Sequence, residues 1–189
     1  MTLVTRIYLV QHADRERVAG DPRLTESGRQ QAVAAARWLH ERGLRALYSS
    51  PLRRAQETAA SIASATGLAV QLETQLRERL NWDGSQTFDA FLADWNRSTR
   101  DRDFVLRNGE SSRSAGERMR EFLGGLTGRP GPVAAVSHGG ATVDLLRTLL
   151  GDDVLPQHLL DRGIPACAIT TLDDLDVLAI ASTAHLRGS

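Results

Sequence analysis

The segment TRIYLVQHAD, residues 5–14, places a short run of β-branched and aromatic residues directly before a polar stretch. Residues 5–10 have the composition of a buried strand, and residues 11–23 have the composition of a loop. In α/β proteins, ligands bind beyond the ends of such strands. His12, which follows the predicted strand closely, is therefore a candidate functional residue.

Strand-like and helix-like runs alternate through most of the remaining chain. Thr25 has the side chain of an N-cap, and the helix that follows it is expected to end at Gly43. Ser50 can cap a second helix in which Pro51 loses nothing by lacking an N–H group, and this helix is expected to reach about Thr66. Further strands are expected at residues 44–48, 69–72, 132–136, 166–172 and 177–182, and further helices around 115–126 and over 142–150. The alternation predicts an α/β fold, a three-layer sandwich in which helices flank a mostly parallel sheet, with room for an antiparallel edge.

The regular alternation weakens over residues 79–110. This stretch is polar, yet it contains five aromatic residues, Trp82, Phe88, Phe91, Trp95 and Phe104. We expect it to form a small inserted lid with one helix, and we expect most of its aromatic rings to pack the insertion onto the sheet. At 189 residues the chain has the length of one domain, 1–189, that buries a core without disulfides or metal ions.

The composition excludes several classes of partner. Lysine plus arginine and aspartate plus glutamate both number 23, so the formal net charge is zero, which argues against nucleic-acid binding and against binding to anionic membranes. The single cysteine, Cys167, cannot form an internal disulfide, and no cysteine and histidine residues have zinc-site spacing. The first residues lack the apolar core of a signal peptide and no run has membrane-spanning length, so we expect a cytoplasmic protein without metal or cofactor. The oligomeric state stays open, and a homodimer is compatible with the sequence.

Three polar residues lie at or just beyond predicted strand ends. His12 follows the first strand, Arg54 lies in the first helical turn after the second, and His138 follows the strand at 132–136. The carboxyl ends of strands in an open α/β sheet converge on one crevice. The start of the helix after Pro51 adds free amides and a dipole that favours a bound anion. The sequence therefore predicts a phosphate site.

Five segments then resemble the motifs of one enzyme family, in that family's order. They are IYLVQHAD (7–14), LTESGRQQA (24–32), SSPLRRAQETA (49–59), VSHGG (136–140) and STAHL (182–186). Over nearly its whole length the chain thus resembles the histidine phosphatase (phosphoglycerate mutase-like) superfamily, and in particular its phosphatase branch.

The resemblance implies a role for each matching residue. It implies that His12 is the nucleophile, that Arg54 clamps the phosphate, and that His138 is the second catalytic histidine. Gly139, beside His138, is expected to let the backbone approach the phosphate. A neutral imidazole whose Nδ1–H is held by a backbone carbonyl leaves Nε2 free to attack phosphorus.

A carboxylate is also needed, because the departing alkoxide requires a proton. Glu78, in the segment LRERLNWDG (76–84), resembles the family's proton donor. Glu73 and Asp83 are nearby carboxylates of equal chemistry, so the sequence leaves the choice among the three open.

The chain departs from the family at its first motif. Where the family has Arg-His-Gly, this sequence has Gln11, His12 and Ala13. Glutamine can donate a hydrogen bond to phosphate but supplies no charge, and neutral contacts are about half as strong as charge-assisted ones. Weaker phosphate binding or slower turnover is expected unless another arginine compensates, the candidates being Arg15, Arg17 and Arg79.

These observations predict a metal-independent phosphomonoesterase that acts on a small phosphorylated metabolite through a phosphohistidine on His12. Two alternatives stay open. The neutral Gln11 favours a catalytically weakened sensor or interaction protein that binds a phosphate ligand. A phosphoglycerate mutase-type transferase is the other, although the interval from Glu78 to His138 is short for the insertion that mutases of the family carry.

Overall fold

The computed structural model describes residues 3–187 and contains a six-stranded sheet in the order β3-β2-β4-β1-β5-β6. The strands are β1 (Arg6–Gln11), β2 (Ala46–Ser49), β3 (Val70–Leu72), β4 (Val133–Ser137), β5 (Ile169–Asp173) and β6 (Asp176–Ser182). Strands β1 to β4 pair in parallel, whereas β5 pairs antiparallel with β1 and β6 pairs antiparallel with β5. The predicted α/β fold, with a mostly parallel sheet and an antiparallel edge, is confirmed.

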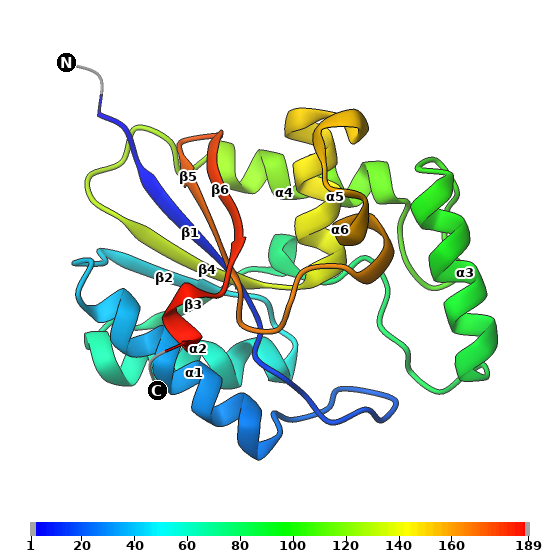
Figure 1. The fold of residues 1–189 in the computed structure, drawn as a ribbon, viewed down its shortest axis with the longest axis horizontal. Helices are drawn as coiled ribbons and strands as arrows, with labels where there is room; N and C mark the ends of the chain where they lie inside the picture. The colour runs from blue at the N-terminus through cyan, green and yellow to red at the C-terminus, as the bar shows by residue number, and fades with distance from the viewer. Residues whose placement is uncertain (1–2, 188–189) are drawn as a thin grey trace.

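Helices cover both faces of this sheet (Figure 1). They are α1 (Glu26–His40), α2 (Arg53–Thr66), α3 (Phe88–Arg100), α4 (Ser112–Gly124), α5 (Gly139–Leu150) and α6 (Gln157–Arg162), with short 3-10 turns at Thr74–Leu76, Asp152–Val154 and Ala184–Leu186. Along β1 the side chains alternate between the two faces, as a strand requires. Ile7 and Leu9 enter the core under α4 and α5, and Tyr8 and Val10 enter the core under α1 and α2. The three layers predicted from the sequence are therefore present.

One predicted strand start was wrong, and one helix was not predicted. Residues 166–168 do not begin β5, because Cys167 has a positive φ of 57° and Ala168 donates its N–H to the Pro165 carbonyl in a turn. Cys167 also donates its backbone N–H to the His12 carbonyl, so this turn supports the loop after β1. The short helix α6, which the sequence analysis did not predict, has only six residues and follows Pro156.

Residues 79–110, the lid segment, leave the sheet and carry α3, which lies to one side of the sandwich (Figure 1). Its aromatic rings were expected to pack on the sheet, and this was wrong. Instead they form a row within the segment: the ring centroids of Trp82 and Phe88 are 5.1 Å apart, those of Phe88 and Phe91 are 6.0 Å apart, and those of Phe91 and Trp95 are 5.9 Å apart. The segment thus has a small aromatic cluster of its own.

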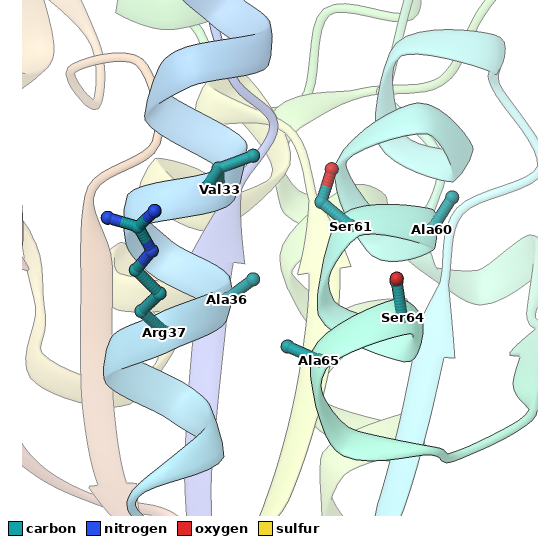
Figure 2. Close-up of a pocket in the computed structure, with 7 residues that line it drawn as sticks. All are labelled: Val33, Ala36, Arg37, Ala60, Ser61, Ser64 and Ala65. Atoms are coloured by element: carbon teal, nitrogen blue, oxygen red, sulfur yellow. The ribbon is translucent and has the colours of Figure 1, made fainter.

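A shallow cavity of about 490 Å³ lies between α1 and α2 (Figure 2). Its lining includes Val33 and Ala36 from α1 and Ser61, Ser64 and Ala65 from α2. No candidate site residue lines it, so this cavity is separate from the predicted phosphate site. In the described part of the chain, no helix combines the length and apolar character needed to cross a membrane.

Helices α4 and α5 approach each other closely at one glycine. A Cβ atom placed on Gly116 would lie 2.2 Å from the Thr148 Oγ1 atom and 2.4 Å from the Asp144 carbonyl oxygen. Gly124 lies on the same helix, but a Cβ atom there would meet nothing within 4 Å. Only the first of these positions therefore depends on the absence of a side chain.

We expect Gly116→Ala to lower the free energy of unfolding by about 1–3 kcal/mol, because the methyl group must push α4 away from α5. Gly124→Ala should change it by no more than about 0.5 kcal/mol, because the added methyl group meets no other atom. Urea denaturation of both variants and the wild type measures the difference. Equal stabilities of the two variants would contradict the close packing of these helices.

Candidate active site

The two candidate histidines lie side by side at the carboxyl edge of the sheet. His12 follows β1 and His138 follows β4, and because these strands are parallel neighbours with Gln11 opposite Ser137, both histidines leave the sheet at the same level. Their ring centroids are 5.2 Å apart, and both side chains are buried. The sheet topology therefore brings together two histidines that are far apart in the sequence.

His12 is held in a defined orientation. Its Nδ1 atom lies 2.8 Å from the Ala13 carbonyl oxygen, which makes Nδ1 the protonated nitrogen and leaves a lone pair on Nε2. The Ala13 N–H group in turn donates to the Thr58 hydroxyl at 3.0 Å, which ties the loop to α2. Burial, together with the positive charge of Arg54, lowers the pKa of His12 to about 3. His12 is therefore a neutral imidazole at physiological pH.

His138 has a different set of contacts. Its Nε2 atom lies 2.7 Å from the Ser50 hydroxyl oxygen, and its Nδ1 atom is buried without a hydrogen-bond partner among the described residues. Burial and the positive charge of Arg54 lower the pKa of His138 well below 6.5. The protein alone thus favours the neutral form, whereas a nearby phosphate would favour the charged form.

Arg54 is a buried cation whose one carboxylate contact within residues 3–187 is long. Its Nη1 atom donates to the Asn81 side-chain oxygen at 3.1 Å, and the nearest Asp21 oxygen is 3.8 Å away. Its Nε–H group is buried with no acceptor among the described residues. Burial, and then the charge of Arg15, lower its pKa to about 10, so it stays charged at neutral pH. A buried guanidinium with a free N–H group is well suited to bind an anion.

Glu78 closes the start of α5. Its carboxylate accepts hydrogen bonds from the backbone N–H groups of Gly140 at 3.0 Å and Ala141 at 2.8 Å. A Cβ atom on Gly140 would lie 2.6 Å from the Glu78 carboxylate, so the approach depends on that glycine. The Glu78 side chain therefore packs against the N-terminus of α5, the helix that begins directly after His138.

The two competing carboxylates lie elsewhere. Glu73 precedes the 3-10 turn at Thr74–Leu76, and among the described residues only its backbone makes hydrogen bonds: its N–H donates to the Ser49 carbonyl, and its carbonyl accepts from the Leu76 N–H. Asp83 is exposed and accepts from the Ser85 N–H group in the lid segment. Of the three candidate carboxylates, the structure brings only Glu78 into contact with the segment that carries His138.

Gln11 is buried beside His12. Its Nε2 atom lies 3.3 Å from the Nε2 atom of His12, and its Oε1 atom has no hydrogen-bond partner among the described residues. A Cβ atom on Gly139 would lie 3.4 Å from the same amide nitrogen, so Gln11 and Gly139 face each other. Ala13, which replaces the family glycine, is fully buried in a small cluster with Leu24 and Cys167.

Three arginines were candidates for compensating for Gln11. Of these, Arg15 is the one whose charge affects the pKa of His12. It is half-buried, no carboxylate oxygen lies within 4 Å of it in the described structure, and its charge contributes to lowering the pKa of His12. Arg79 is instead paired with Asp144 in the protein interior, at 2.7 Å. Arg17 is exposed. The expectation that Arg79 could reach the phosphate is therefore wrong.

Two residues of this site were missed. Ser50 was expected only to cap the second helix, and this was wrong, because the N-cap of α2 is Leu52 and the Ser50 hydroxyl contacts His138 instead. Asn81 was not singled out. The serine pair at the end of β2 was a signal for the first, since strand ends line the site. Nothing in the local sequence indicated Asn81, because its contact with Arg54 joins positions 27 residues apart. Within residues 3–187, no three histidine, cysteine, aspartate or glutamate side chains converge as a metal site would require.

The fold and this site define a class of α/β protein in which two histidines and a buried arginine meet at the carboxyl edge of a parallel sheet. Residues 7–175 match the model of the histidine phosphatase superfamily, branch 1. The chain belongs to this superfamily. Proteins similar to it in sequence and in structure include phosphatases of phosphorylated metabolites.

Several relatives with assigned activities are similar to the chain. A glucosyl-3-phosphoglycerate phosphatase of Mycolicibacterium vanbaalenii is 31% identical over 172 residues, covering 78% of this chain and 75% of the relative. A probable phosphoglycerate mutase of Erwinia tasmaniensis is 31% identical over 185 residues, covering 89% and 84%. Among solved structures, a mycobacterial glucosyl-3-phosphoglycerate phosphatase in complex with inorganic phosphate gives a TM-score of 0.76 at 29% identity, covering 95% and 98%. Phosphoserine phosphatase of Entamoeba histolytica, in complex with 3-phosphoglyceric acid, gives 0.76 at 25% identity, covering 96% and 99%.

The neutral His12 predicts a specific dependence of stability on pH. The pKa of His12 in the folded protein is about 3, below its unfolded value near 6.5, so below pH 6.5 the unfolded chain gains a proton that the folded protein does not bind. Between pH 7 and pH 5 this effect alone should lower the free energy of unfolding by about 2 kcal/mol. We expect His12→Asn to lose that part of the decline, as measured by urea denaturation at both pH values. The same decline in variant and wild type would show that folded His12 protonates freely.

Proposed function

We propose that this protein is a metal-independent phosphomonoesterase that hydrolyses a small phosphorylated metabolite through a phosphohistidine on His12. The observation that carries the proposal is the geometry of His12, whose Nδ1–H is held by the Ala13 carbonyl at 2.8 Å, so that Nε2 keeps its lone pair. The ring of His138 lies 5.2 Å from that of His12, and the charge of the buried Arg54 helps to lower the pKa of His12. The relatives named as phosphatases support the same class of reaction.

In the first step, Nε2 of His12 attacks phosphorus and the bond to the leaving oxygen breaks. Phosphoryl transfer requires mainly positioning and positive charge around the equatorial oxygens. Arg54 supplies that charge through its free N–H groups, and the approach of the phosphate favours protonation of His138. The Gly139 N–H group at the start of α5 adds a backbone donor. Glu78 transfers its proton to the leaving oxygen, which departs as an alcohol.

In the second step, water replaces the leaving group. The Glu78 carboxylate accepts a proton from this water, the oxygen bonds to phosphorus, and the bond between phosphorus and Nε2 of His12 breaks. Inorganic phosphate leaves, and His12 and protonated Glu78 are regenerated. Throughout, the Nδ1–H group of His12 keeps its bond to the Ala13 carbonyl, so the imidazole does not rotate.

We expect His12→Ala to abolish hydrolysis while the protein stays folded, because the nitrogen proposed to form the phosphoenzyme is removed. Purified wild type and variant would be assayed with para-nitrophenyl phosphate, phosphoserine and 3-phosphoglycerate, with a chelator present. Acid-labile, alkali-stable label on the wild type after mixing with a ³²P-labelled substrate would identify phosphohistidine. Unchanged turnover in His12→Ala would refute the proposal, and turnover that depends on a bisphosphate primer would favour the mutase.

One observation favours a second function, that of a sensor or interaction protein that binds a phosphate ligand with little turnover. The residue that lies 3.3 Å from the His12 Nε2 atom is the neutral amide of Gln11, where the family has an arginine.

We propose that Arg15 provides the missing charge in the enzyme, because it is half-buried near Arg54 without a carboxylate partner. The two functions differ in what happens when charge is restored at position 11.

If Arg15 compensates for Gln11, Arg15→Gln should lower kcat/KM by about tenfold or more, the loss expected for one charge-assisted contact. Gln11→Arg in the Arg15→Gln background should restore most of it, and Arg17→Gln, on an exposed residue of the same loop, should have little effect. Steady-state kinetics on para-nitrophenyl phosphate measures all three. A wild type without turnover that gains it through Gln11→Arg alone would instead establish the sensor.

A further inference from the structure

The residue after Glu78 points away from the site and into the protein interior. Arg79 Nη1 lies 2.7 Å and 2.9 Å from the two carboxylate oxygens of Asp144 on α5. The exposed fraction is 2% for the Arg79 side chain and 0% for that of Asp144, so this ion pair is fully desolvated. Its position next to Glu78 in the chain gives it a direct connection to the proposed proton donor.

The same ion pair joins three helices. Arg79 Nη2 donates to the Thr99 hydroxyl on α3 at 2.8 Å, and its guanidinium carbon lies 3.9 Å from the Trp95 ring centroid on the same helix. From α4, the Ser112 hydroxyl donates to Asp144 at 2.6 Å. The lid helix α3 is therefore fastened to α4 and α5 through a single buried network.

Glu78 is fixed at the edge of this network. The backbone N–H group of Arg79 donates to the Glu78 carboxylate at 2.9 Å. The main chain of Arg79 thus binds Glu78, while its guanidinium binds Asp144. A Cβ atom on Gly140 would meet the Trp95 ring at 2.4 Å as well as the Glu78 carboxylate at 2.6 Å, which places the lid tryptophan and the carboxylate against the same backbone atom. Movement of α3 would thus reach Glu78 by two routes.

We propose that the buried Arg79–Asp144 ion pair is a positioning device that holds Glu78 against the start of α5 and makes its placement depend on docking of the lid helix α3. The inference rests on the proposed function, in which Glu78 gives its proton to the leaving oxygen. Arg79 and Asp144 act through Glu78 and do not touch the substrate.

The physical reason is that neither charge can lose its partner at low cost. Separation of a desolvated pair leaves an uncompensated buried charge, so the network favours one arrangement over intermediate ones. Arg79 also occupies the position directly after Glu78, so displacement of its side chain shifts the backbone that carries the carboxylate. Transfer of a proton to the leaving oxygen requires hydrogen-bond distance, and a small displacement would remove it.

The test compares two aryl phosphates whose leaving groups differ strongly in their need for a proton donor. Phenoxide leaves phenyl phosphate poorly without a proton, whereas the two nitro groups of 2,4-dinitrophenyl phosphate let its phenolate leave without protonation. We expect Arg79→Met and Asp144→Asn to lower kcat on phenyl phosphate at least about tenfold more than on 2,4-dinitrophenyl phosphate. KM should stay within about threefold for both substrates, because the phosphate-binding groups are unchanged. Arg79→Lys, which keeps the charge, should recover part of the lost kcat.

Two reference variants make the comparison specific. Glu78→Gln should show the same dependence on the leaving group with a larger amplitude. Arg113→Met removes an arginine whose two bonds to Asp103, at 2.6 Å and 3.0 Å, form an exposed ion pair at the end of the lid segment, and it should leave both rates unchanged. Urea denaturation of each variant reports its folding. If Arg79→Met does not fold, the double variant Arg79→Met/Asp144→Leu removes both charges and is expected to give the same kinetic pattern.

The outcomes separate this inference from the function on which it rests. Equal losses on the two substrates in Arg79→Met, with leaving-group dependence in Glu78→Gln, would overturn the positioning role alone. Absence of that dependence in Glu78→Gln would overturn the assignment of Glu78 as proton donor, and the inference with it. Leaving-group dependence in Glu78→Gln, Arg79→Met and Asp144→Asn, together with recovery in Arg79→Lys, would support the inference.

Discussion

The parallel pairing of β1 with β4 is the constraint on which the rest of the site depends. The register places Gln11 opposite Ser137, and the His12 N–H group donates to the Ser137 carbonyl at 3.0 Å. A slip of one residue would send every side chain of β1 to the other face of the sheet, and it would bury Ile7 and Leu9 among the wrong helices. The hydrophobic pattern of a central strand therefore fixes the distance between two histidines that are far apart in the sequence.

That geometry places several groups of the same charge together. Arg54 is buried, Arg15 is half-buried nearby, and their charges act with burial to lower the pKa of His138 and of His12. Without an anion, the pocket favours neutral imidazoles, and an imidazole with an available lone pair is the form that attacks phosphorus. The negative charge of a phosphate would reverse the field at His138 while bonding directly to Arg54. Under the proposed function, one arrangement would thus provide a neutral nucleophile, His12, and a cation, His138, that forms when the substrate binds.

The sequence predicted those features that depend on short stretches of chain. Strand ends, helix starts and the five family-like segments were sufficient to locate His12, Arg54 and His138, and the structure brings all three together. Features that depend on long-range packing were not accessible in this way. Asp144, the partner of Arg79, lies 65 residues further along the chain. Nothing in the local sequence of α5 indicates that this aspartate is buried and forms an ion pair. Likewise, the turn at Cys167 is bonded to the loop after β1 through the His12 carbonyl, a long-range contact. The local composition around Cys167 is that of a strand and therefore did not indicate a turn.

The neutral residue at position 11 has a consequence for the energetics of the whole pocket. An arginine there would place a third guanidinium near Arg54 and Arg15, at a position where the side chain is buried and desolvation of another charge is costly. Glutamine removes that repulsion and lowers the cost of folding, but it also weakens the binding of every phosphate group, substrate and product alike. In the proposed reaction, inorganic phosphate would then be released more readily, whereas the transition state would keep the proposed contacts of its equatorial oxygens to Arg54 and His138. Under the proposed function, glutamine at position 11 would therefore weaken the binding of phosphate in substrate, product and transition state alike, while leaving in place the charges proposed to act most strongly in the transition state.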